Sequence, residues 1–77
     1  MTEREIRKEL LEISEEIASY DFIEVDESTK NFIESAPIQK AFWLVLGGVN
    51  NSEFLQEEFS ERLEKIEKAL KDLWLLA

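Results

Sequence analysis

Two stretches of the sequence carry apolar residues at alternating spacings of three and four, which aligns them along one side of an α-helix. The first stretch contains Ile6, Leu10, Ile13, Ile17 and Tyr20. The second contains Leu55, Phe59, Leu63, Ile66, Leu70 and Leu73, with this alternation after its first step. Narrow apolar stripes of this kind are typical of helices that pack against other helices. We therefore predict an all-α, small antiparallel helical bundle with two long helices, at about residues 3–20 and 51–76.

Local signals place two short helices between the long ones. Thr2 and Glu5 have the spacing of a capping box, which starts the first long helix. Asp26 or Ser28 is expected to cap a helix at about residues 28–36, after an extended connection through DFIEVDES. Pro37 disfavours helical geometry in the preceding residue and suits the first turn of a helix, so another helix is expected at about residues 38–47.

A tight corner is predicted between this helix and the second long one. Gly47 and Gly48 are expected to end the helix, since glycine adopts the left-handed conformation that closes helices. Asn50 would then cap the next helix with Glu53 at the capping-box position, and Val49 would pack against Phe54 as a hydrophobic staple.

Length and composition exclude several classes of protein. A chain of 77 residues buries only about 60 to 65 per cent of its unfolded surface, and it is predicted to form a single domain, residues 1–77. Cysteine and histidine are absent, which removes disulfides, the usual zinc sites, and thiol or imidazole catalysis. The phosphate-binding loops G-x-x-x-x-G-K and G-x-G-x-x-G are also missing. We therefore expect no enzyme activity, no cofactor and no metal site.

The net charge of −9, from 18 acidic and nine basic residues, opposes direct binding to nucleic acid or to anionic membranes. Basic residues are missing between positions 12 and 29, although most glutamates of the second long helix precede a lysine or arginine by four residues. The seven acids of this interval are Glu12, Glu15, Glu16, Asp21, Glu24, Asp26 and Glu27. They form either a solvated surface or a face that binds a basic protein, with a nucleic-acid mimic as the extreme form.

Two runs contain apolar residues that do not belong to the two helix stripes. They are AFWLVL at residues 41–46 and the C-terminal LWLLA, apart from Leu73. A thin core leaves some of them for an interface, unless both runs pack together inside one chain. The candidate interface residues are Phe42, Trp43, Val45, Trp74, Leu75 and Leu76. They predict a homo-oligomer, a dimer or higher, or a seat for another protein.

These patterns favour a small acidic protein-binding module that docks a basic partner. Inhibitors, immunity factors, regulatory factors and phage anti-defence proteins are examples of that class, by analogy only. The alternative is a self-assembling structural or adaptor subunit. No apolar stretch approaches the 18 or so residues that span a bilayer, and the N-terminus does not resemble a signal peptide, so a cytoplasmic location is expected.

Overall fold

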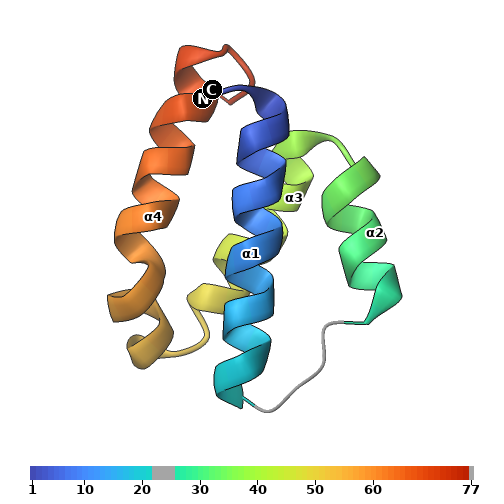
Figure 1. The fold of residues 1–77 in the computed structure, drawn as a ribbon. Coiled ribbons are helices and arrows are strands. Elements are labelled where there is room, and N and C mark those ends of the chain that lie inside the picture. The colour runs from blue at the N-terminus through green and yellow to red at the C-terminus, as the bar shows by residue number, and fades with distance from the viewer. Residues whose placement is uncertain (22–25, 77) are drawn as a thin grey trace.

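The computed structural model describes residues 1–21 and 26–76, with the backbone alone at Asp21. Within these residues the chain forms four α-helices and no strand. The helices are α1 (Glu3–Asp21), α2 (Glu27–Ser35), α3 (Ile38–Val49) and α4 (Glu53–Asp72). Consecutive helices run in opposite directions, and both termini lie at the same end of the bundle (Figure 1). The all-α prediction is confirmed, whereas the expected connection at residues 22–25 lies outside the described residues.

Two helices hold the bundle together. α1 and α3 each pack against all three other helices, while α2 and α4 stand on opposite sides without touching (Figure 1). The core contains Ile6, Leu10, Ile13, Ile33, Ile38, Ala41, Phe42, Val45, Val49, Leu55, Phe59, Leu63, Ile66 and Leu70. All buried side chains of the described part are apolar, and the two predicted stripes supply most of them. No helix of that part combines the length and the apolar character needed to cross a membrane.

The predicted helix starts are confirmed for α1 and α2. The Thr2 amide donates to Glu5 Oε1 at 3.0 Å, and the Glu5 amide donates to Thr2 Oγ1 at 3.2 Å, which completes the capping box. Asp26 caps α2, because its Oδ1 accepts a hydrogen bond from the Thr29 amide at 2.8 Å. Hydrogen bonds from Thr2 and from Thr29 lower the pKa of the Glu5 and Asp26 carboxyls, respectively, since these bonds favour the ionised form.

The Asp26 cap makes part of the stability depend on pH. A carboxyl whose pKa is lower in the folded state stabilises the fold above its unfolded pKa, and loses that contribution as pH falls through the folded value. The free energy of unfolding of the protein should therefore exceed that of Asp26→Asn at neutral pH. The gap should shrink once the pH passes below the ordinary Asp value of 3.8. Urea unfolding of both proteins from neutral to acid pH measures this gap, and a gap that is the same at every pH would contradict the prediction.

The corner between α3 and α4 differs from the prediction. Gly47 and Gly48 lie inside α3, neither has a positive φ, and the helix continues to Val49. The capping box at Asn50 and Glu53 is also wrong, because Asn50 ends α3 and Ser52 precedes α4 without a side-chain cap. Burial of Val49 in the core explains why α3 continues for two residues beyond the predicted end.

The predicted staple between Val49 and Phe54 does not form. Val49 belongs to the core, whereas Phe54 is half exposed and packs edge-on against Tyr20, with the ring centroids 5.3 Å apart. Tyr20 is therefore half exposed, although the first stripe predicted an inward position for it. It lies near the end of α1 and Phe54 lies in the first turn of α4, and both helix ends are at the end of the bundle away from the termini (Figure 1).

Candidate functional site

The C-terminal turn holds the most unusual residue of the described chain, Trp74. α4 ends at Asp72 rather than near residue 76, because Trp74 adopts the left-handed conformation with φ 61°. The Trp74 amide donates to the Lys71 carbonyl at 3.0 Å, and the Leu75 amide donates to the Leu70 carbonyl at 2.9 Å. This pair of bonds is a Schellman motif, in which glycine usually takes the left-handed position.

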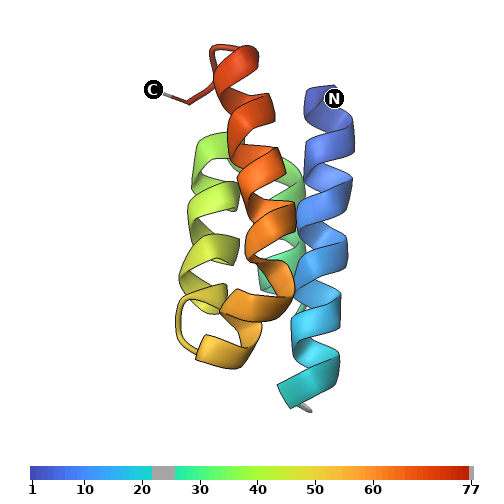
Figure 2. The same ribbon diagram turned by 90° about the vertical axis from the view of Figure 1, so that its left-hand side faces the viewer.

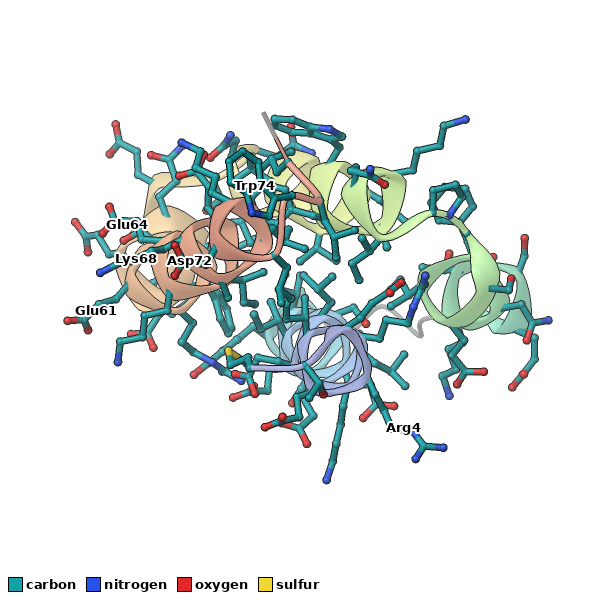
Figure 3. All side chains as sticks on the ribbon, turned by 90° about the horizontal axis from the view of Figure 1, so that it is seen from above. Arg4, Glu61, Glu64, Lys68, Asp72 and Trp74 are labelled. Atoms are coloured by element: carbon teal, nitrogen blue, oxygen red, sulfur yellow. The ribbon has the colours of Figure 1, made fainter. Side chains whose placement is uncertain are left out.

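The turn leaves the Trp74 indole in solvent. Its exposed fraction is 93%, the largest among the big apolar side chains of the described residues. Figure 3, viewed from the end that holds the termini, shows the side chain on the side of α4 away from α1. Leu75 and Leu76, in contrast, fold back and pack partly buried against the core. The turn thus separates two leucines that stabilise the fold from an indole that does not.

The outward side of α3 is the second exposed apolar region. Trp43 is 53% exposed and Leu44 is exposed beside it, while the next turn offers only Gly47. Lys40 is the single charged residue of α3, so this side of the helix carries no acid. The Trp43 ring lies against that of Phe42, with the ring centroids 5.3 Å apart.

The six predicted interface residues therefore separate into three groups. Phe42 and Val45 are buried in the core of their own chain, so neither is an exposed apolar side chain. Their position on the inner side of α3 explains this, since α1, α2 and α4 all pack there. Leu75 and Leu76 are half-buried, which leaves Trp43 and Trp74 as the two exposed indoles.

A groove of about 160 Å³ runs between α3 and α4. Figure 2 shows α4 in front, with α3 on one flank and α1 on the other. The groove is lined by Phe42, Leu46, Val49 and Asn50 of α3 and by Gln56, Ser60, Leu63, Glu64 and Glu67 of α4. Sites for cofactors and drug-sized ligands usually measure about 300 to 1,000 Å³, so the groove suits inserted side chains instead.

The predicted acidic face lies on α1 and at the start of α2. Glu12 and Glu15 are exposed, and the hollow beside them is lined by α1 residues alone, so no second element shapes it. Asp26 and Glu27 are exposed in the first turn of α2, where Asp26 already serves as the cap. The side chain of Asp21 and the whole of Glu24 lie outside the described residues.

Glu16, one of the seven acids, has a basic partner from outside the interval. Its Oε2 accepts a hydrogen bond from Arg62 Nη1 at 2.6 Å, and Glu9 Oε1 lies 2.7 Å from Arg62 Nη2. The guanidinium also sits over the Phe59 ring, 5.8 Å from its centroid. Partial burial lowers the pKa of Arg62, but the bonds to Glu16 and Glu9 outweigh this, and the pKa is raised overall. Arg62 thus joins α4 to α1.

The spacing of four between glutamates and basic residues in α4 produces no ion pair within that helix, all of which the structure describes. Arg62 reaches across to α1 instead of pairing with Glu58, four residues earlier. Figure 3 shows Glu61, Glu64 and Lys68 as separate side chains on the outer side of α4. Charges on α4 are consequently free to face solvent or a partner.

Replacing Arg62 by methionine should lower the free energy of unfolding by about 1 to 2 kcal/mol, because two carboxylates lose their shared partner. The exposed Lys65, one turn along α4, gives a matched control, and Lys65→Met should change stability by less than about 0.5 kcal/mol. Urea unfolding at low salt measures both. The Arg62 effect should shrink in about 1 M salt, which screens such pairs. Equal losses in the two variants would contradict a specific role for Arg62.

Groups suited to catalysis or metal binding do not gather in the part of the chain that the structure describes. None of its buried side chains is polar, so no titratable group there is enclosed by the core. No three carboxylates of that part lie close enough together to hold a metal ion. The candidate site consists instead of the two exposed indoles and the groove between α3 and α4. Comparisons of the chain with protein-family models, with curated proteins and with solved structures found no match, and function is therefore inferred from these side chains alone.

Proposed function

We propose that this protein is a small, non-enzymatic protein-binding module that acts as an inhibitor or regulatory factor for a basic protein in the cytoplasm. The observation that carries the proposal is Trp74, an almost fully exposed indole in a left-handed turn. The acidic face of α1 and α2 contributes long-range attraction, and the exposed indoles supply the contact itself.

The energetics of Trp74 support a role in binding. A left-handed conformation costs a bulky L-residue about 1 to 2 kcal/mol, which glycine would avoid. The exposed indole returns little of that cost, since burial in its own chain is nearly absent. A residue that strains its turn without stabilising the fold is explained if it serves an interaction. Tryptophan is also among the residues that most often dominate binding energy at interfaces.

The net charge supports a basic partner. At −9 the chain attracts cationic surfaces over long distances and repels anionic ones. Electrostatic attraction mainly raises the association rate, whereas buried apolar contacts slow dissociation. Binding through both features should weaken with salt and still depend on the indoles.

Trp74→Gly should stabilise the protein by about 1 kcal/mol, because it relieves the strained turn. The same variant should lose at least about tenfold in affinity for the partner, the effect expected of a tryptophan hot spot. Urea unfolding measures the first effect. For the second effect, partners are captured from a cell extract with the tagged protein, and the captured partner is then titrated with each variant.

Trp74→Ala is the matched control, since it removes the indole but keeps a side chain in the left-handed position. Alanine should weaken binding as much as glycine does, without the gain in stability. If both variants bind their partner as tightly as the unchanged protein, the proposal is wrong. If the captured partner stays bound at high salt, the part of the proposal that names a basic partner is wrong.

Self-assembly is the second candidate, favoured by the outward side of α3, which carries Trp43 and Leu44 and no acid. Two copies that face each other through α3 would each cover the Trp43 indole of the other copy. Sedimentation of the protein at rising concentration tests this, with Trp43→Gln as the variant expected to remain monomeric. A single 9.1 kDa species at all concentrations would exclude it.

A further inference from the structure

The groove between α3 and α4 combines an apolar floor with a charged wall on α4. Phe42, Val49 and Leu63 form its buried floor, and Leu46 is partly buried beside them. On α4 its lining includes Glu64 and Glu67, and no basic residue lines it.

The dimensions of the groove match a helical segment. Its lining on α4 extends from Gln56 to Glu67, which at 1.5 Å per residue is about 16 Å, or three turns. On α3 the lining from Phe42 to Asn50 covers about 12 Å. A segment of two to three helical turns would therefore place apolar anchors at positions i, i+3 or i+4, and i+7 along the floor.

The position of the groove in the bundle supports the same occupant. α1 packs against both α3 and α4, and Arg62 marks the side of α4 that faces α1. Residues 56, 60, 64 and 67 lie on another side of the α4 helix, so the groove opens where no helix of the described chain covers the α3–α4 pair. Trp43 precedes the groove residue Leu46 by three positions and therefore borders the same side of α3.

Charge decides between a second copy and a different partner. A second copy would bring its own net charge of −9 toward a groove whose only charged lining is acidic. A basic segment would instead place lysine or arginine beside Glu64 and Glu67 and leave its apolar side for the floor. Charge complementarity thus favours a basic amphipathic helix over another copy of this chain.

We propose that the α3–α4 groove is the docking site for a basic amphipathic helix of the partner protein. The apolar side of that helix covers Leu46 and the floor, Trp43 borders it from α3, and its cations face Glu64 and Glu67. This inference rests on the proposed function, because it names the segment that the binding module recognises.

A synthetic peptide of about 15 residues, four turns of leucine and lysine in amphipathic helical order, is a suitable probe. An isomer with the same composition and scattered leucines is its control. Calorimetry and the fluorescence of Trp43 and Trp74 follow the titration at low salt. We expect the amphipathic peptide to bind at least about tenfold tighter than its isomer, because only the ordered peptide presents an apolar side.

Matched charge variants of the protein locate the site. Glu64→Gln with Glu67→Gln should weaken peptide binding roughly tenfold, since two carboxylates beside the peptide are removed. Glu34→Gln with Glu58→Gln removes the same charge from exposed positions outside both the groove and the acidic face, and should weaken binding less than about twofold. Circular dichroism checks that both variants keep their helices.

Three results would overturn the inference. Equal weakening by the two charge pairs would show general attraction to an acidic protein, and equal affinity for both peptides would show that the groove has no role. Dimers that form through Trp43 and exclude the peptide would make the occupant a second copy. The peptide can also be added as a competitor during partner capture. If capture depends on Trp74 but the peptide does not reduce it, the proposed function stands and the assignment of the groove is wrong.

Discussion

Replacing Phe42 by alanine is expected to lower the free energy of unfolding by about 3 to 5 kcal/mol, a large share of the stability of a small domain. Phe42 is 1% exposed and is the largest fully buried side chain among the described residues. It belongs to α3, which packs against all three other helices, so the cavity would open at their common junction. Urea unfolding followed by far-UV circular dichroism measures the loss.

Trp43 is the matched control, since it is the next residue on the same helix and another large aromatic. Trp43→Ala should lower the free energy of unfolding by at most about 1 to 2 kcal/mol, clearly less than Phe42→Ala, because the indole is already half in solvent. If Phe42→Ala fails to fold, Phe42→Leu should still fold with a smaller loss. Equal losses at positions 42 and 43 would contradict the assignment of one ring to the core and the other to the surface.

The contrast between these two rings explains which parts of the fold the sequence could predict. Periodic stripes identify the inner side of long helices, and they correctly predict Ile6, Leu10, Ile66 and Leu70 as core residues. In α3 nearly every residue from Ala41 to Leu46 is apolar, and periodicity then gives no inner side. Only packing against the other helices separates Phe42 from Trp43.

Local signals were reliable where a side chain binds the backbone near it in sequence. The Thr2–Glu5 capping box and the Asp26 cap need only residues three positions apart, and both form. The corner at Gly47 and Gly48 depends instead on how far Val49 is drawn into the core. Tertiary packing outweighs the preference of glycine for helix ends at that corner.

The candidate site was predictable only in part. The apolar excess pointed to Trp43 and Trp74, and both are exposed. No sequence rule placed Trp74 in a left-handed turn, since glycine or asparagine normally fills that position. The groove and the Arg62 contacts to α1 join residues far apart in the chain, which spacing along one helix does not reveal.

Replacing both Gly47 and Gly48 by alanine should raise the free energy of unfolding by about 1 to 2 kcal/mol, the usual difference between these residues inside a helix. Both glycines lie within α3 without a positive φ, and a Cβ added at either would meet nothing within 4 Å. The isolated chain therefore has no steric need for glycine here. Urea unfolding of the two single variants and of the double variant measures the gain, which should be shared between the positions.

Binding should respond to the same substitutions in the opposite sense if a partner approaches the outward side of α3. Gly47 is exposed one turn beyond Trp43 and Leu44, where the missing side chain permits close approach of another backbone. Gly47→Ala would then stabilise the protein while weakening its complex, whereas the half-buried Gly48 would affect stability alone. If Gly47→Ala binds the partner with unchanged affinity, the partner contacts only the groove and Trp74. If the double variant is less stable than the original protein, the bundle itself requires these glycines.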